Sequence, residues 1–133
     1  MHPLHPNWGP NHRNLSLRIP LSDDDNVRIE HRSAGADANP YLVVASVLAG
    51  MHYGLTKEIS PPEMIQESEV IDPEVTLPVK WQDSLDEFNQ ATILPQYFDK
   101  EFCRIFHHCR TCELDRFSSQ ISNKDFEWYL RSI

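Results

Sequence analysis

Cysteines are few in this chain of 133 residues, and a long hydrophobic run is missing. The three cysteines all lie between Cys103 and Cys112. Such a small odd number, with no leader sequence after Met1, excludes a disulfide framework and indicates a reducing, intracellular setting. The longest apolar run, Tyr41 to Met51, is about half of the roughly 20 residues that a membrane-spanning helix needs. We therefore expect a cytoplasmic protein that has no membrane partner.

The chain also contains few positively charged residues. Twelve Lys and Arg residues stand against 20 Asp and Glu residues, which gives a formal net charge of -8. An acidic chain lacks the positive field that holds a phosphate backbone, so general nucleic-acid binding is excluded. The hydrophobic share of 40% and the charged share of 24% are typical of a globular protein. At this length we expect one domain with a single core.

The first part of the chain predicts a small amount of β-structure. Residues 1–12 are rich in proline and histidine without a repeating pattern, which indicates an irregular lead-in. Leu15 to Ile19 and Val27 to Arg32 lie on either side of a polar, Asp-rich run, which predicts two antiparallel strands. From Ile59 to Val79, prolines and acidic residues predict an irregular loop that covers an edge of the fold.

Four helices are expected after the hairpin. Asn39 before Pro40 places a capping side chain and a proline at the start of the first helix. Apolar residues then cover nearly its whole circumference, so we expect this helix to be enclosed on most sides. Apolar spacing and capping signals predict three more helices, near residues 81–88, from after Pro95 to Phe117, and after Ser122. One hairpin from an incomplete sheet and about four packed helices make an α+β fold.

A row of charged side chains lies on the predicted hairpin. Strand alternation puts Arg28, Glu30 and Arg32 on one face, and Arg18 on the first strand can converge with them. Several guanidinium groups together suit an anionic ligand such as a nucleotide tail. Glu30 then either pairs with the arginines or holds a divalent cation that bridges phosphate oxygens. The alternative is a solvated hairpin face with internal ion pairs.

A second group of possible ligands lies in the third predicted helix. His107, His108, Cys109 and Cys112 are residue types that bind zinc. Structural zinc normally needs ligand pairs on separate elements, whereas these four residues fall in one helix. His108 and Cys112 can share a face, but Cys109 points elsewhere. The pattern therefore favours an ordinary helix surface over a small zinc module.

Four blocks of sequence follow one another at consistent spacing. They are Asn11-His12-Arg13, Leu17-Arg18-Ile19-Pro20, Arg28-Ile29-Glu30-His31-Arg32, and the run from Ala34 to Leu42. This string resembles the C-terminal part of the catalytic domain of the glutamine synthetase family. The long Ala-Gly-Ala-Asp-Ala-Asn-Pro-Tyr run is similar to the branch that includes γ-glutamylpolyamine (putrescine) synthetases. The resemblance assigns residues 13–133 to this part, and implies that the N-terminal domain and the first part of the catalytic domain are absent.

The resemblance implies an ATP-dependent ligase that joins glutamate to an amine. In that family ATP phosphorylates the glutamate side chain, and ammonia or another amine such as a polyamine displaces phosphate from the γ-glutamyl phosphate intermediate. It also implies Mg²⁺ or Mn²⁺ as cofactor, and a homo-oligomer for the full-length parent. We expect the fragment alone to be inactive, and the sequence leaves the amine open. The alternative is a non-catalytic, truncated relative with a structural or assembly role.

Five residues receive roles from the resemblance. It implies that Arg13, Arg18 and Arg28 bind ATP, and that Arg13 and Arg28 also act on the group that is transferred. It implies that Arg13 and Arg32 bind the glutamate substrate and that Glu30 is a metal ligand. These roles agree with the chemistry of the residue types, because phosphoryl transfer depends on cations that neutralise oxygens in a fixed geometry.

Overall fold

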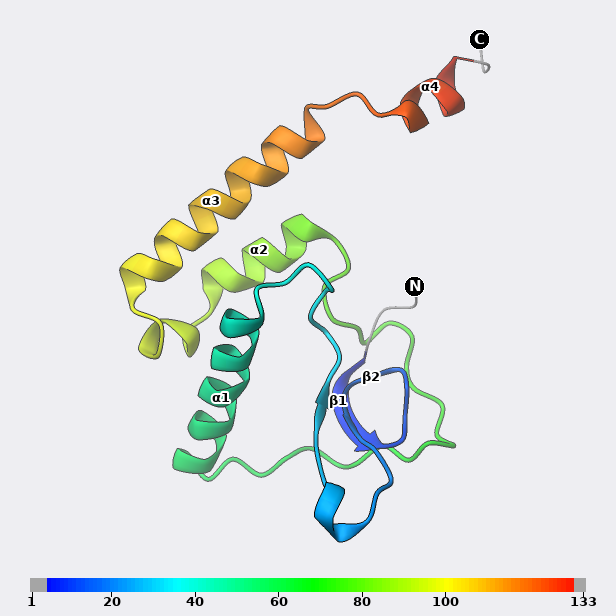
Figure 1. The fold of residues 1–133 in the computed structure, drawn as a ribbon, viewed down its shortest axis with the longest axis vertical. Helices are drawn as coiled ribbons and strands as arrows, with labels where there is room; N and C mark the ends of the chain where they lie inside the picture. Colours follow the sequence, from blue (N-terminus) through cyan, green and yellow to red (C-terminus); the bar gives the residue numbers. More distant parts are fainter. Residues whose placement is uncertain (1–4, 131–133) are drawn as a thin grey trace. The chain divides into compact units, whose positions relative to one another are not determined.

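The computed structural model describes residues 5–130, which form a three-stranded sheet and four α-helices. This confirms the predicted α+β class. The chain divides into two units (Figure 1). The first, Met1–Val79, contains the sheet and one helix, and the second, Lys80–Ile133, contains the other three helices.

The sheet has the strand order β1-β2-β3, with β1 at His5–Pro10, β2 at Leu15–Ile19 and β3 at Glu30–His31. Strands β2 and β3 are antiparallel, as the sequence predicts, and Arg18 is paired with Glu30 in their register. The contact continues past β3, because the Arg32 N–H donates to the Ser16 carbonyl at 2.9 Å. Arg18 on the middle strand therefore lies directly opposite Glu30 on β3.

The third strand is shorter than the sequence predicts. The polar run forms a short 3₁₀ helix, η1, at Asp24–Asn26, and only Glu30 and His31 of the expected strand Val27 to Arg32 pair as a strand. Within residues 5–130, β3 is paired on one side only. Val27 and Ile29 are exposed, so no packing extends the strand toward the turn.

The expectation of an irregular lead-in at residues 1–12 differs from the structure. Residues 1–4 lie outside the described part, but His5–Pro10 is strand β1, which runs parallel to β2 with an irregularity between His5 and Trp8. Prolines are tolerated there because β1 is an edge strand. Proline content alone therefore gave the wrong prediction for this strand.

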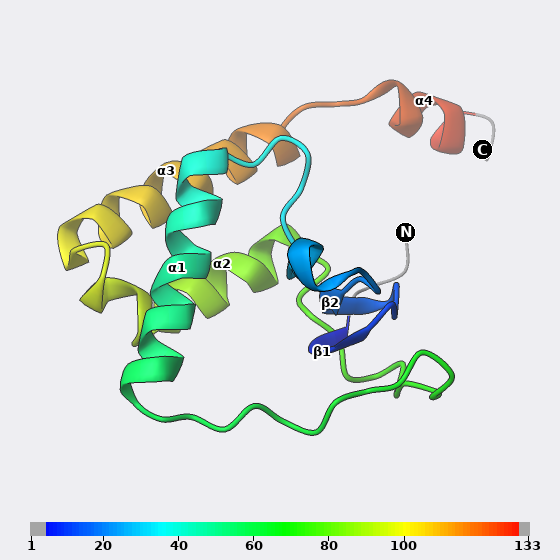
Figure 2. The ribbon, with the colours of Figure 1, turned by 60° about the horizontal axis from the view of Figure 1, so that its bottom comes forward.

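The proline-rich segment after the first helix runs along the free edge of β1 (Figure 2). The Ile65 N–H donates to the Trp8 carbonyl at 3.1 Å, and Trp8 Nε1 donates to the Pro62 carbonyl at 2.9 Å. As expected, the segment from Ile59 to Val79 contains no helix or strand and covers an edge. It approaches so closely that a Cβ on Gly9 would lie 2.0 Å from the Ile65 carbonyl oxygen.

Helix α1, Pro40–Thr56, begins as predicted. The Asn39 side chain accepts hydrogen bonds from the N–H groups of Tyr41 and Leu42, at 3.0 and 3.3 Å. The expected enclosure of this helix is wrong for the described residues, since Ala49 alone among its residues is buried. Its exposed apolar side chains are Tyr41, Val44, Leu48, Met51 and Leu55. No helix within residues 5–130 has the length and hydropathy needed to cross a membrane.

The second unit is a helical hairpin followed by a short helix. Helix α2 spans Trp81–Gln90 and packs against α3, Lys100–Ser118, with the short 3₁₀ helix η2, Leu94–Gln96, between them. The rings of Phe88 and Phe106 lie 5.3 Å apart between the two helices. Helix α4, Asn123–Tyr129, begins with the predicted capping box of Ser122 and Asp125. The three predicted helices of this unit are thus confirmed.

We predict that Gly9→Ala lowers the free energy of unfolding by about 1–3 kcal/mol, because the new Cβ would collide with the Ile65 carbonyl oxygen. Gly50→Ala is the matched control, since its Cβ would meet nothing within 4 Å in the interior of α1. This control should raise stability by up to about 1 kcal/mol. Urea denaturation followed by circular dichroism measures both changes. Equal effects of the two substitutions would contradict the close contact between the loop and β1.

Candidate functional site

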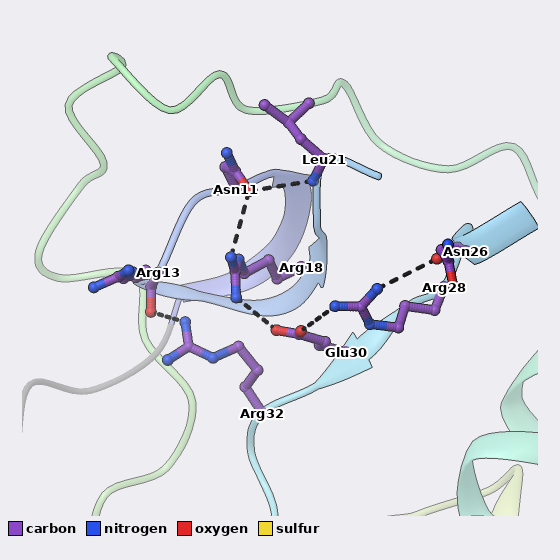
Figure 3. Close-up of polar contacts among 8 residues, drawn as sticks. All are labelled: Asn11, Arg13, Arg18, Leu21, Asn26, Arg28, Glu30 and Arg32. Atoms are coloured by element: carbon purple, nitrogen blue, oxygen red, sulfur yellow. Dashed lines mark hydrogen bonds and ion pairs between the residues drawn. The ribbon is translucent and has the colours of Figure 1, made fainter. Parts of the chain in front are cut away.

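Three charged side chains meet where β3 pairs with β2. Strand pairing sets Arg18 opposite Glu30, and Arg18 Nη1 lies 2.8 Å from Glu30 Oε2. Arg28, which precedes the strand, reaches the other carboxylate oxygen, with Nη2 3.7 Å from Oε1 (Figure 3). Each oxygen of Glu30 therefore faces a different guanidinium group. We call these three residues the arginine–glutamate cluster.

Arg18 is the most constrained member of the cluster. Its side chain is 23% exposed, compared with 56% for Arg28. A second nitrogen, Nη2, donates to Asn11 Oδ1 at 3.3 Å. Its Nε atom is buried and has no hydrogen-bond partner among the described residues. Arg18 is therefore held from two sides and keeps an unpaired donor.

Arg28 is less constrained and more accessible. Apart from its longer contact with Glu30, Arg28 Nη1 donates to the Asn26 carbonyl at 3.3 Å. This carbonyl belongs to the turn that precedes β3, so the turn holds the guanidinium beside the carboxylate. The exposed part of Arg28 is available to an anionic ligand.

Two of the predicted site residues lie beside the cluster and do not contact Glu30. Arg32 donates through Nη1 to the Arg13 backbone carbonyl, and the Arg13 guanidinium points away from Glu30 (Figure 3). The structure therefore brings Arg18, Arg28 and Glu30 together. Arg13 and Arg32 contact each other at the border of this cluster. The predicted row of Arg28, Glu30 and Arg32 on one strand face is not continuous, because β3 is too short.

The cluster does not complete a metal site by itself. In the part of the chain that the structure describes, no three His, Cys, Asp or Glu side chains are grouped so that they could hold a metal ion. Glu30 is the one carboxylate of the cluster, and both its oxygens face arginines. Mg²⁺ requires about six oxygen ligands in octahedral geometry. Glu30 can therefore supply one ligand at most, and the described residues do not fit the metal unaided.

The His and Cys residues of α3 form a pair and not a cluster. Cys112 Sγ lies 3.8 Å from His108 Nε2, so these two residues share a face as expected. All three cysteines are free, and Cys103 is buried while Cys109 and Cys112 are exposed. Cys109 does not take part in this contact, and the absence of a zinc module stays a prediction.

Sequence comparison places the whole segment in one family of domains. The family model described as "Glutamine synthetase, catalytic domain" matches residues 1–129. The chain is 38% identical over 130 residues to gamma-glutamylputrescine synthetase PuuA of Escherichia coli (strain K12), covering 98% of this chain and 28% of that protein. It is 27% identical over 129 residues to glutamate–isopropylamine ligase of Pseudomonas sp, covering 95% of this chain and 28% of the relative.

A third relative extends the comparison to the glutamine synthetases themselves. Type-1 glutamine synthetase 2 of Dictyostelium discoideum is 29% identical over 136 residues, covering 98% of this chain and 26% of the relative. The chain thus spans little more than a quarter of the length of the curated relatives that it matches. The first two names give different amines, putrescine and isopropylamine, and the third names glutamine.

The two ion pairs of Glu30 should differ in strength. A double-mutant cycle of Arg18→Gln and Glu30→Gln should give a coupling free energy of about 1 kcal/mol, because this pair is short and partly buried. The cycle of Arg28→Gln and Glu30→Gln should give less than about 0.3 kcal/mol, because that pair is longer and more exposed. Chemical denaturation at low salt measures both. A larger coupling for Arg28 would contradict the geometry of the cluster.

The three thiols should differ in reactivity. Burial raises the pKa of the Cys103 thiol, and the Asp99 carboxylate adds to this shift, so less of it is the reactive thiolate at neutral pH. We expect a neutral-pH thiol reagent to modify the exposed Cys109 and Cys112 quickly, and Cys103 only after denaturation. Mass spectrometry of the labelled peptides gives the three rates. Fast labelling of Cys103 in the folded chain would contradict its burial.

Proposed function

This chain belongs to the glutamine synthetase catalytic-domain family, and from this premise we propose that it is the nucleotide-binding C-terminal portion of an ATP-dependent glutamate-amine ligase. The proposed reaction passes through γ-glutamyl phosphate, which an amine then converts to the amide. The chain spans about 28% of its first relatives, so this activity is proposed for a longer polypeptide or assembly. The isolated chain is proposed to be inactive.

The arginine–glutamate cluster is the observation that carries the proposal. Two guanidinium groups share one carboxylate, so the cluster keeps an excess of positive charge in an otherwise acidic chain. The exposed Arg28 guanidinium and the partly exposed Arg18 guanidinium are the donors that a ligand can reach, and phosphate oxygens are strong acceptors for guanidinium groups. These features support a site for the phosphates of ATP more than a merely solvated strand face.

The individual roles are those that the family resemblance implies, and accessibility supports two of them. We assign Arg28 and Arg18 to the ATP phosphates, since exposed Arg28 can move to a transferring phosphoryl group while Arg18 is held in place. Arg13 is assigned to the phosphates and the glutamyl group, and Arg32 to the glutamate substrate. Glu30 is assigned one ligand position on Mg²⁺ or Mn²⁺, and the other ligands would come from outside this chain. A bound divalent ion would neutralise phosphate oxygens.

The substrates are proposed from the relatives. Glutamate is common to the names of the ligases that the chain resembles, and putrescine is the amine in the name of the relative at 38% identity. We propose glutamate with a polyamine as the first substrates to test, with ammonia as the competing amine. The parent is proposed to be a homo-oligomer, as the family resemblance implies.

A non-catalytic, truncated relative remains the second candidate. It is favoured by one observation: the described residues supply a single carboxylate at the cluster and no complete metal site. Such a protein would keep the fold for structure or assembly. The two candidates differ in whether the cluster supports catalysis when the rest of the domain is supplied.

A chimaera tests the proposed function. This chain would replace the segment that it matches in E. coli gamma-glutamylputrescine synthetase, and phosphate release would be measured with ATP, glutamate and putrescine. We expect turnover by the chimaera, and a loss of about 100-fold or more with either Arg28→Ala, which removes a positive charge from the reacting phosphates, or Glu30→Gln, which removes the proposed metal ligand.

Arg104→Ala is the matched control for this assay. Arg104 also forms a close ion pair, with Glu101, but this pair is exposed on α3, which belongs to the second unit. Its removal should leave turnover within about twofold, because exposed pairs contribute little. A folded chimaera whose turnover is unchanged by both cluster substitutions would contradict the proposal. A folded chimaera without any turnover would favour the non-catalytic relative.

A further inference from the structure

Asn11 has an unusual backbone conformation next to the arginine–glutamate cluster. It follows Pro10 at the end of β1 and has a φ of 54°, in the left-handed region. Among residues other than glycine, asparagine is one of the few that adopt this conformation readily. Its backbone N–H donates to the Ile19 carbonyl at 2.9 Å. Asn11 is therefore fixed against the end of β2.

This backbone geometry directs the amide side chain toward Arg18. Asn11 Oδ1 accepts one hydrogen bond from Arg18 Nη2 and another from the Leu21 N–H, each at 3.3 Å. Figure 3 shows the amide between the guanidinium group and the end of the second strand. Asn11 Oδ1 thus holds both the main chain after Pro20 and the Arg18 side chain by hydrogen bonds.

The two anchors of Arg18 differ in charge. Glu30 holds Nη1 through an ion pair and offsets positive charge, whereas Asn11 holds Nη2 through a neutral oxygen. Contacts on both terminal nitrogens fix the plane of the guanidinium group. They use two of its five N–H groups, so the other three keep fixed directions. A neutral anchor can therefore orient the arginine without weakening its attraction for an anion.

We infer that Asn11 is a positioning residue that holds the plane of the Arg18 guanidinium for an oxyanion. The orientation of the Arg18 guanidinium depends only on contacts within this chain, and not on the proposed function. The identity of the anion, a phosphate group of a nucleotide, rests on the proposed function. The sequence alone predicts no role for Asn11, because neither its residue type nor its spacing shows that its amide faces Arg18.

Two substitutions separate the amide from the backbone conformation. Asn11→Gly keeps the left-handed conformation, which glycine adopts freely, and removes the acceptor. Asn11→Asp keeps an acceptor at the same place and adds a negative charge. Circular dichroism melts of the full chain should agree for wild type and Asn11→Gly, so that a change at Arg18 is not a consequence of unfolding. If Asn11→Gly melts at a lower temperature, the rotation rate of the Arg18 guanidinium in Asn11→Asp still tests the inference.

The first measurement is nitrogen-15 NMR of the Arg18 guanidinium in the full chain, with its signals assigned by their loss in Arg18→Lys. We expect slow rotation with distinct Nη signals in the wild type and in Asn11→Asp. Rotation should be at least about tenfold faster in Asn11→Gly, because one of two hydrogen-bonded anchors is lost. Rotation as slow in Asn11→Gly as in the wild type would overturn the inference. Fast rotation in Asn11→Asp would overturn it as well.

The second measurement titrates inorganic triphosphate into the same samples and follows the Arg18 signals. We expect wild type to bind, Asn11→Gly to bind about tenfold more weakly, and Asn11→Asp to bind weakly despite slow rotation, because its charge repels the anion. Equal affinity of wild type and Asn11→Gly would overturn the role toward a ligand. Absence of any triphosphate effect on wild-type Arg18, with rotation changed as expected, would support the positioning and contradict the proposed phosphate site.

Discussion

The double ion pair of Glu30 is the interaction on which the site depends. A lone carboxylate between two arginines draws their guanidinium groups to one place, where they would otherwise repel each other. The antiparallel register of β2 and β3 makes this possible, because it sets Arg18 directly opposite Glu30. The turn before β3 brings the second arginine to the free oxygen. The positive charge that remains is concentrated on a short ribbon in an acidic chain.

Local signals in the sequence were sufficient for much of the fold. The cap of α1 at Asn39 and the capping box of α4 depend on neighbouring residues, and the spacing of aromatic residues marks α2 and α3. Strand β2 has the expected bounds because its alternation is regular. In each case the information lies within one turn or one strand, so the sequence carries it directly.

Features that depend on distant parts of the chain could not be predicted in this way. Strand β1 depends on pairing with β2 and with the segment that covers its other edge. The hydrogen bond between Trp8 and Ile65 joins residues far apart in the chain, so no local pattern encodes it. The short β3 and the exposed stripe of α1 depend equally on which surfaces are present to pack against them. At the site, strand alternation and pairing predicted that Arg18 can converge with the row that contains Glu30, and left open whether Glu30 pairs with the arginines or holds a cation. The contribution of Asn11 depends on its left-handed backbone conformation, which the sequence did not predict.

A crystal structure of the chimaeric enzyme with ADP and Mn²⁺ would show directly whether the arginine–glutamate cluster binds the nucleotide. We expect Arg18 and Arg28 to lie within hydrogen-bonding distance of phosphate oxygens, and Glu30 to contribute one oxygen to the metal. We also expect Asn11 to remain bonded to Arg18 in that complex. A nucleotide bound elsewhere, with the arginine–glutamate cluster unchanged and facing solvent, would show that the cluster is not a nucleotide site.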